Sequence, residues 1–172
     1  MYIFELTPQN AHLVAELMAR LVPEWWDYDS AMKQITASGK VGWYMGEDAD
    51  TPKGWIVIKG IEDYSCVEID ASGYDDNGEF TSCEKLAALL DKVEQYAIAK
   101  GLRLVRETLS SPRMSCHGRK VTDYVKELST LKSTSKKLEY MQSRGYRLAG
   151  FMPDCYEVGV HGIMILKNLC EV

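Results

Sequence analysis

The sequence predicts an α/β fold in which helices cover a mixed sheet. Short, apolar, β-prone runs alternate along the chain with segments whose apolar residues recur at helical spacing. The composition, 46% hydrophobic and 26% charged, is that of an ordinary globular protein. A folded chain of this size buries roughly 70% of the surface of its unfolded form, which is enough for one core. We find no repeat or low-complexity linker, so we expect one domain over residues 1–172.

The N-terminal quarter predicts one strand followed by two helices. Residues 2–6 form the β-prone run, and Thr7 is expected to cap the next helix with Pro8 at its first position. A second, shorter helix is expected from about Asp29, with Gly39 placed to end it. The apolar residues of the first helix recur at helical spacing: Ala11, Val14, Leu17, Met18 and Leu21.

The middle of the chain predicts three strands and a long helix. Residues 40–45 and 54–59 are strand-like, and the polar residues between them suit a hairpin loop. A third strand is expected near residues 64–71. After a loop rich in glycine and aspartate, apolar residues recur as one buried stripe of a helix that ends at Gly101: Leu86, Leu90, Val93 and Ala97.

The C-terminal part predicts a strand over residues 102–109, a helix leading to Gly145, and two final strands near residues 146–152 and 162–166. Residues 110–130 show no clear pattern, and the sequence alone does not distinguish an ordered lid from a loose insertion. The predicted order is β-α-α-β-β-β-α-β-α-β-β, which favours a mixed sheet covered by helices.

Charge and cysteine usage exclude several kinds of protein. The chain has 20 Lys and Arg against 25 Asp and Glu, a net charge of −5, which argues against nucleic-acid binding through a broadly basic face. No apolar run approaches the ~20 residues that cross a bilayer, and no secretory signal is apparent, so we expect a soluble, cytoplasmic protein without membrane contact. Neither a disulfide framework nor a metal site is expected, because the three histidines are scattered and no C-x-x-C pair occurs among the cysteines: Cys66, Cys83, Cys116, Cys155 and Cys170.

The most distinctive segment begins at Leu138. It consists of a helix ending in a Gly145-Tyr146 step, a strand, an Asp-x-Tyr loop at Asp154, and an apolar run that ends in Lys-x-Leu at Leu169. Together with the order of elements, this segment resembles the GNAT family of acyl-CoA-dependent N-acyltransferases over nearly the whole chain. The resemblance implies the GNAT fold, acetyl-CoA as co-substrate and an amine acceptor, either a small molecule or a protein.

The resemblance also implies where the cofactor binds. In the family, a turn of the pattern Q/R-x-x-G-x-G/A offers backbone N–H groups to the CoA pyrophosphate at the start of a helix. In this chain the turn corresponds to Thr81, Ser82, Cys83, Glu84 and Lys85. Glu84 and Leu86 stand where glycines are expected, and the carboxylates of the preceding loop, Asp75, Asp76 and Glu79, oppose a polyphosphate.

The strand near residues 64–71 supplies a candidate catalytic group. Strand alternation places Val67, Ile69 and Ala71 on one face, and Glu68 on the other. Because an unpaired carboxylate on a central strand is costly to bury, Glu68 is either a general base or a salt-bridged or solvated carboxylate. The resemblance further implies that the backbone at Ile69 and Ala71 orients the pantetheine arm.

The resemblance places the catalytic acid, a tyrosine, four residues before the glycine of the Gly-aromatic step. Met141 occupies that position here, and Tyr140 lies one residue earlier. A shift of one residue turns a helical side chain by about 100°. Tyr140 is therefore the candidate acid, and an ordinary packed tyrosine is the alternative.

Two further groups are candidates for substrate binding. Trp25 and Trp26 fall between the first two helices, where the family shapes its acceptor pocket; exposure would indicate a ligand or partner surface, and burial would indicate core packing. His117 and Arg119 can bind an acidic substrate or phosphate, or they belong to a capped structural loop.

These observations predict a GNAT-like N-acyltransferase in which an acceptor amine attacks acetyl-CoA directly in a ternary complex, with Glu68 assisting proton removal. The alternative is a GNAT-like ligand-binding or regulatory module that does not use CoA. A third hypothesis is a homodimer formed through an aromatic surface near Trp25.

Overall fold

The computed structural model describes residues 1–76 and 84–170. Its contacts divide the chain into two compact units, which are described separately below: unit 1 is Met1–Arg103, and unit 2 begins at Leu104. The order of strands and helices is the predicted one, with one additional short helix in unit 2 and two short 3₁₀ turns in unit 1. The expectation of one domain over residues 1–172 stays a prediction.

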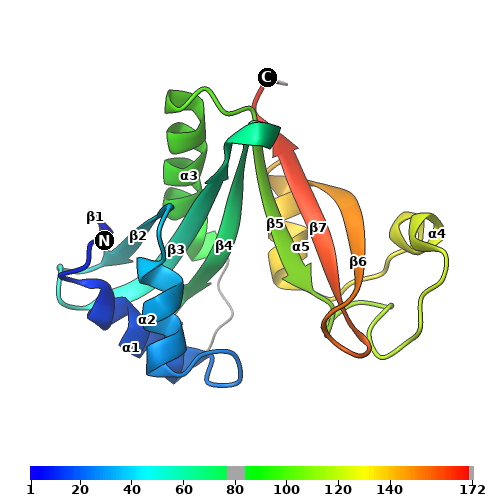
Figure 1. Cartoon of the computed structure of the whole chain (residues 1–172), viewed down its shortest axis with the longest axis horizontal. Coiled ribbons are helices and arrows are strands. Elements are labelled where there is room, and N and C mark those ends of the chain that lie inside the picture. The colour runs from blue at the N-terminus through cyan, green and yellow to red at the C-terminus, as the bar shows by residue number, and fades with distance from the viewer. Residues whose placement is uncertain (77–83, 171–172) are drawn as a thin grey trace. The chain divides into compact units, whose positions relative to one another are not determined.

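Unit 1 contains an antiparallel sheet in which each strand pairs with the next along the chain. Its strands are β1 (Tyr2–Glu5), β2 (Lys40–Gly46), β3 (Pro52–Ile61) and β4 (Cys66–Tyr74). Its helices are α1 (Ala11–Leu21), α2 (Tyr28–Thr36) and α3 (Ala87–Ala99). Figure 1 shows α1 and α2 on one face of this sheet and α3 on the other.

Both faces of the unit 1 sheet are packed. Tyr44, Trp55 and Val57 project toward α1 and α2 and join their buried apolar residues in one cluster. On the other face, Trp43 meets Tyr96 of α3 edge to face, with ring centroids 5.8 Å apart. The predicted stripe of α3 is confirmed, since all four of its members are buried: Leu86, Leu90, Val93 and Ala97.

Strand β4 carries a β-bulge that the sequence did not reveal. Val57 of β3 pairs with Ala71, whereas the next residue, Ile58, pairs with Ile69, so Asp70 is the extra residue of β4. Ala71 therefore packs on the same face as Val57, against the α1–α2 cluster, while Ile69 lies on the opposite face. The predicted alternation, which placed Ile69 and Ala71 on one face, is wrong for Ala71 because one inserted residue reverses every side chain after it.

Helix α1 begins at Ala11 and not at Thr7. The Thr7 backbone N–H donates to the Asn10 side-chain oxygen at 2.8 Å, and the Asn10 amide donates to the Glu5 carbonyl at 3.0 Å. These bonds close a separate turn over residues 7–10 before the helix starts. The cap predicted at Thr7 is therefore wrong by one turn.

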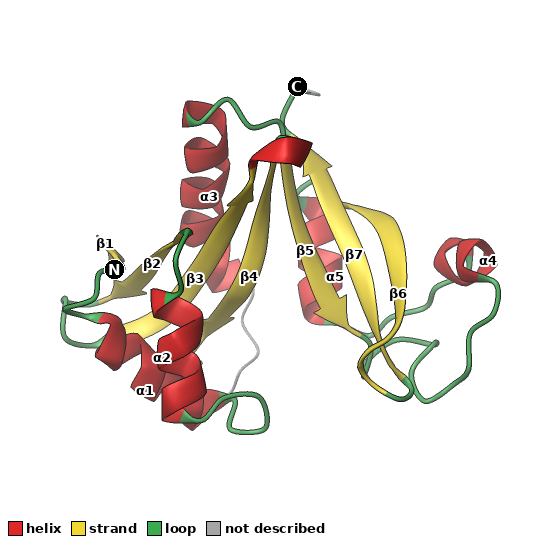
Figure 2. Cartoon of the chain, in the orientation of Figure 1, coloured by secondary structure: helices red, strands yellow, loops and turns green. Residues whose placement is uncertain are grey.

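In unit 2 the strands pair antiparallel in the order β5-β7-β6. Its strands are β5 (Leu104–Ser110), β6 (Arg147–Glu157) and β7 (Val160–Asn168). Helix α5 (Lys136–Ser143) covers one face of this sheet, as Figure 2 shows, and buries Leu138 and Met141.

The segment over residues 110–130, which the sequence left open, is ordered. Ser111, Met114 and Cys116 are buried, and the segment includes helix α4 (Tyr124–Ser129). The Asp123 carboxylate caps α4 by accepting the Lys126 backbone N–H at 3.0 Å. It is therefore a folded loop of unit 2 and not a loose insertion.

Across residues 1–76 and 84–170, no helix has the combined length and apolar character needed to span a membrane.

Candidate functional site

The predicted site residues fall on both units. Glu68, Ile69 and Ala71 lie on β4, and Lys85 lies in the 3₁₀ turn (Glu84–Leu86) that leads into α3. Trp25 and Trp26 join α1 to α2. Tyr140 lies on α5, and His117 and Arg119 lie in the loop after β5. The remaining members of the predicted pyrophosphate turn lie outside the described residues: Thr81, Ser82 and Cys83.

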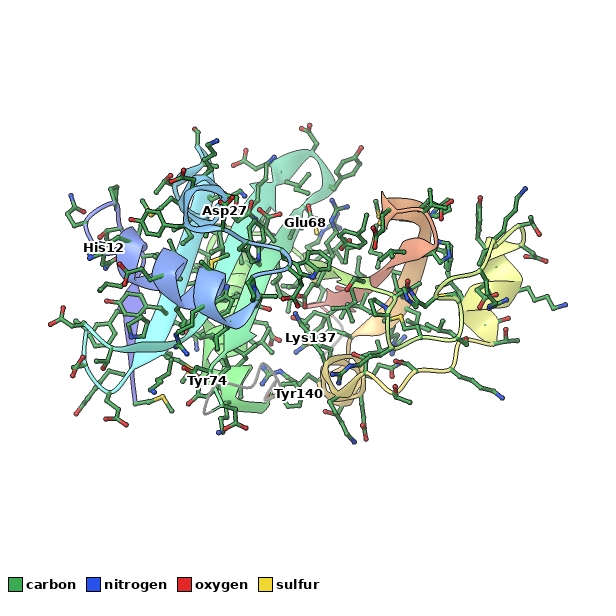
Figure 3. The ribbon with its side chains drawn as sticks, turned by 90° about the horizontal axis from the view of Figure 1, so that it is seen from below. His12, Asp27, Glu68, Tyr74, Lys137 and Tyr140 are labelled. Carbon is green, nitrogen blue, oxygen red and sulfur yellow. The ribbon has the colours of Figure 1, made fainter. Side chains whose placement is uncertain are left out.

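Strand β4 directs two carboxylates to the side of the sheet that α1 and α2 cover. Glu68 pairs across the ladder with Lys59 of β3 and is half-buried (Figure 3). Asp70, the bulge residue, accepts a hydrogen bond from Gln34 of α2 at 2.7 Å and forms an ion pair with Lys40 of β2. The Lys40 ammonium compensates the charge of Asp70. Glu68 beside it is a half-buried carboxylate of the kind that can accept a proton during a reaction.

The acidic loop after β4 is compensated by basic side chains. Asp75 is buried and accepts a hydrogen bond from the Arg20 guanidinium of α1 at 2.6 Å. Asp76 forms an ion pair with Lys85, and this hydrogen bond raises the pKa of the Lys85 ammonium. Lys85 also lies over the Tyr74 ring, 5.2 Å from its centroid. Asp75 and Asp76, two of the three carboxylates expected to oppose a polyphosphate, are therefore paired within unit 1. The third, Glu79, lies outside the described residues.

The start of α3 is compatible with an anion. Its first turn contains no acidic residue. The side chain of Leu86, which replaces an expected glycine, is buried in the core. Unpaired backbone N–H groups and the positive end of the helix dipole favour negative charge at such a terminus.

The aromatic segment between α1 and α2 divides into a buried part and an exposed part. Trp26 packs against the α1–α2 cluster, whereas Trp25 is 45% exposed and Tyr28 is 42% exposed. Asp27 and Ser30 form a capping box that holds the start of α2 in place. The hydrogen bond from the Ser30 amide lowers the pKa of the Asp27 carboxyl. Trp26 therefore belongs to the core, while Trp25 and Tyr28 meet the condition set for a ligand or partner surface.

The two candidate positions for the catalytic acid on helix α5 differ in burial. Met141 is buried in the core of unit 2, and Tyr140 is half-buried on α5 (Figure 3). Lys137, one turn earlier, forms an ion pair with Glu107 of β5. Since Met141 is buried and cannot donate a proton, Tyr140 is the side chain at this part of α5 with an ionisable hydroxyl.

His117 and Arg119 are held within their own loop. The Arg119 guanidinium donates to the Glu127 carboxylate at 2.6 Å and to the Ser115 carbonyl at 2.8 Å. His117 is exposed, and its Nδ1 lies 3.4 Å from the Ser111 hydroxyl. These contacts are those of a capped structural loop, in which the charge of Arg119 is already compensated.

Sequence reasoning missed three groups. The Arg20–Asp75 pair joins residues 55 positions apart in the chain, and no local pattern marks it. Glu107 stands in an otherwise β-prone run, which was the available signal for a special role. His161 is completely buried on β7, although the sequence treated it as one of three scattered histidines.

Comparisons with known proteins identify the fold. No protein-family model matches the chain, and no curated protein matches it in sequence. Among solved structures, an aminoglycoside 6'-N-acetyltransferase complexed with coenzyme A is similar with a TM-score of 0.81 at 13% identity, covering 98% of this chain and 97% of that one. The aminoglycoside 6'-N-acetyltransferase from Enterococcus faecium is similar with a TM-score of 0.79, also at 13% identity and with the same coverage of both chains.

A protein with a different acceptor has a similar structure. The ribosomal-protein-S18-alanine N-acetyltransferase from Escherichia coli has a TM-score of 0.71 at 9% identity, covering 98% of this chain and 93% of that one. The chain therefore has the fold of the GNAT N-acetyltransferases, as the sequence predicted. At these identities the likeness establishes the fold and leaves the acceptor open.

Proposed function

We propose that the protein is a GNAT-like N-acyltransferase that transfers an acetyl group from acetyl-CoA to an acceptor amine by direct attack in a ternary complex. The observation that supports this most is the structural match along nearly the whole chain to an acetyltransferase crystallised with coenzyme A. The ion pairs of Asp75 and Asp76 add support, because they reduce the electrostatic objection that the sequence raised.

In this proposal the residues of unit 1 hold the co-substrate. Lys85 and the backbone N–H groups at the start of α3 would bind the phosphates, and the β4 backbone at Ile69 and Ala71 would orient the pantetheine arm. Acetyl-CoA supplies the activated acyl group as a thioester. The bulge at Asp70 interrupts the regular pairing of β4 with β3 between Ile69 and Ala71.

Two side chains are proposed to move protons. An amine attacks a carbonyl only after it has lost its proton, and Glu68 would accept that proton directly or through water. The departing thiolate is stabilised by protonation, and Tyr140 would donate that proton from its hydroxyl. This assignment uses the half-buried position of each side chain on its own unit.

The acceptor is proposed to be a cationic amine. Residues 1–103 carry 9 basic and 18 acidic side chains, a net charge of −9, whereas residues 104–172 carry 11 basic and 7 acidic ones, a net charge of +4. Glu24, Asp27 and Asp29 are the sequence neighbours of the exposed Trp25 and Tyr28, and all three are exposed. Aromatic faces and carboxylates together suit an organic ammonium group.

The acidic segment around Trp25 and Tyr28 limits which amines would be good acceptors. Because Glu68 is proposed to take the proton of the attacking amine, a second amine of the same molecule would be the one that keeps its positive charge, and its contact with the acidic segment, during the reaction. A diamine or polyamine should therefore react better than a monoamine of the same length. This class agrees with the aminoglycosides that the similar acetyltransferases are named for.

A thiol-release assay tests the proposed function. Acetyl-CoA is mixed with the protein and either putrescine or n-butylamine, and the release of CoA thiol is followed. Acetyl transfer predicts thiol release that depends on the amine and a higher kcat/KM for putrescine. Release with neither these amines nor a panel of aminoglycosides and peptide N-termini would contradict acetyl transfer, whereas equal rates with both amines would contradict only the cationic acceptor.

The alternative of a module that does not use CoA drew its support from the missing glycines and the acidic loop. The ion pairs of Asp75 and Asp76 reduce that support. The cytoplasmic location and the homodimer expected from the sequence stay predictions, and sedimentation across the micromolar range tests the dimer.

A further inference from the structure

His161 is a completely buried titratable side chain that the proposed reaction does not use. It lies near the start of β7, and three of its nitrogens meet polar atoms from separate segments of unit 2. Its backbone N–H donates to the Ser111 hydroxyl oxygen at 2.9 Å. Its ring contacts the Arg119 carbonyl, at 2.8 Å from Nε2, and the Asp154 backbone N–H, at 3.0 Å from Nδ1. His161 thus joins the loop after β5 to strand β6.

These partners fix the protonation state of the ring. A carbonyl oxygen only accepts hydrogen bonds, so Nε2 carries a proton and donates it to Arg119. A backbone N–H only donates, so Nδ1 presents a lone pair to Asp154. The structure therefore assigns His161 to the neutral imidazole with its proton on Nε2.

A second arrangement is available beside the same nitrogen. The Asp154 Oδ1 atom lies 3.5 Å from Nδ1 and accepts the Gly159 backbone N–H at 2.8 Å. Asp154 has a φ of 49°, in the left-handed region that non-glycine residues seldom occupy. It lies where β6 leaves register with β7, between the pairs Met152–Gly162 and Glu157–Val160. Asp154 therefore lies in a strained bulge. Its backbone N–H, a donor, and its carboxylate, an acceptor, are both within reach of the His161 Nδ1 atom.

We propose that His161 and Asp154 form a pH-sensitive switch in the β6 bulge, separate from the proposed acetyl transfer. Protonation of Nδ1 would create a new N–H that faces the Asp154 backbone N–H. Two donors that face each other repel. The new N–H would then pair with the Asp154 carboxylate, which must turn toward Nδ1 and release the Gly159 amide. The bond from Nε2 to the Arg119 carbonyl would persist, so the loop after β5 stays attached.

The groups around the ring set the balance between the two arrangements. Asp154 on β6 favours the protonated ring, and so does the Phe151 ring, whose centroid lies 5.0 Å from that of His161. Arg119 opposes it, but its charge is compensated by Glu127 of α4. His117 reaches the network through the Ser111 hydroxyl and also opposes a second positive charge.

The change has a route to β5. Tyr156, in the same bulge, donates from its hydroxyl to the Thr108 carbonyl of β5 at 3.2 Å. A new backbone conformation at Asp154 would alter the strand that carries Tyr156. Protonation at His161 would thus reach β5 through a side-chain contact, and the sheet pairing of β5 with β7 would remain.

Nuclear magnetic resonance between pH 8 and pH 5 tests the switch. At pH 8 the ¹⁵N spectrum of His161 should show the tautomer protonated on Nε2. As the pH falls, the amide signals of Asp154 and Gly159 should shift together with the His161 ring signals. Unchanged Asp154 and Gly159 amides in a protein that remains folded down to pH 5 would overturn the proposal.

Three variants assign the response. His161→Gln keeps one acceptor and one donor but cannot titrate, so the amide shifts should disappear. Asp154→Asn, at an exposed side chain, should remove the shift of the Gly159 amide even if His161→Gln fails to fold. His117→Gln is the matched control, and it should retain the shifts. Persistence of the Gly159 shift in Asp154→Asn would overturn the proposal.

Discussion

The two units of the molecule handle buried polarity differently. In the described part of the chain, unit 1 buries one charged side chain, Asp75, at the end of a strand, and its sheet is packed on both faces by apolar residues. Unit 2 buries Glu107, Ser111 and His161, each in contact with another segment. The net charges also differ, −9 for residues 1–103 and +4 for residues 104–172.

In the described residues of unit 1, Asp75 is the one charged side chain among the buried ones. The proposed cationic acceptor would therefore use acidic side chains outside this core. Unit 2 depends on particular polar contacts, which are costly to break and sensitive to protonation. The predictions below test this difference, beginning with the largest effect.

The largest expected effect concerns Glu68 of unit 1. Glu68→Gln removes the proposed base and should lower kcat by about 10²–10⁴-fold, the usual contribution of general base catalysis. Thiol release under saturating substrates measures it. Thermal unfolding should be nearly unchanged, because the substitution keeps the shape of a half-buried side chain.

Glu62→Gln, at an exposed carboxylate in the 3₁₀ turn before β4 (Glu62–Tyr64), is the matched control and should retain full activity. A Glu68→Gln variant with more than half of the normal kcat would show that proton removal does not depend on this side chain.

The Lys137–Glu107 pair tests the polar interior of unit 2. Lys137→Met removes the ion pair of the buried Glu107 carboxylate and should lower the free energy of unfolding by up to about 3–5 kcal/mol. The double variant Lys137→Met/Glu107→Leu should recover most of that loss, because apolar pairs of similar volume replace buried ion pairs well. Urea unfolding measures both.

Lys136→Met is the neighbouring control. Its pair with Glu139 is exposed and should contribute less than about 1 kcal/mol. A double variant no more stable than Lys137→Met would contradict the electrostatic account of this pair.

Lys85 tests the compensated loop of unit 1. Lys85→Ala removes the ion pair of Asp76 and the proposed phosphate contact, so it should raise the Kd for acetyl-CoA by about 5-fold. Calorimetry at low salt measures the change. Lys92→Ala, another exposed lysine farther along α3, should leave the Kd unaltered.

The smallest expected effect is the alkaline titration of Tyr44 in the unit 1 core. Burial raises the pKa of its phenol, and the hydroxyl donates to the Ala49 carbonyl at 2.8 Å. Because the folded state holds the proton more tightly, this contribution is complete below the unfolded pKa of about 10 and is lost as the pH rises through the folded pKa.

Tyr44→Phe should cost about 1 kcal/mol at pH 7 and should weaken the loss of stability above pH 10. Tyr64→Phe, at an exposed ring, should change neither quantity. Urea unfolding at both pH values distinguishes the two variants.

The sequence predicted the order of the elements because long helices and alternating strands leave periodic patterns. The stripe of α3 and the Gly145 boundary of α5 are examples. Helix α4 escaped prediction because six residues are too few for a periodic stripe. The start of α1 was misplaced because Asn10, and not Thr7, closes the turn before it.

The candidate site was less accessible to sequence reasoning. A bulge adds one residue without any change in composition, so the displacement of Ala71 at Asp70 was invisible. The compensation of Asp75 by Arg20 and the burial of His161 depend on contacts between distant segments. Glu68 and Tyr140 were selected from strand alternation and from the family resemblance, and their roles stay predictions.

Calorimetric titration with acetyl-CoA tests acetyl transfer most directly, because every proposed role in unit 1 depends on that co-substrate. The account predicts saturable binding of one molecule per chain with a Kd in the micromolar range, about −8 kcal/mol. Heats indistinguishable from those of buffer, with sub-millimolar acetyl-CoA and folded protein, would contradict it.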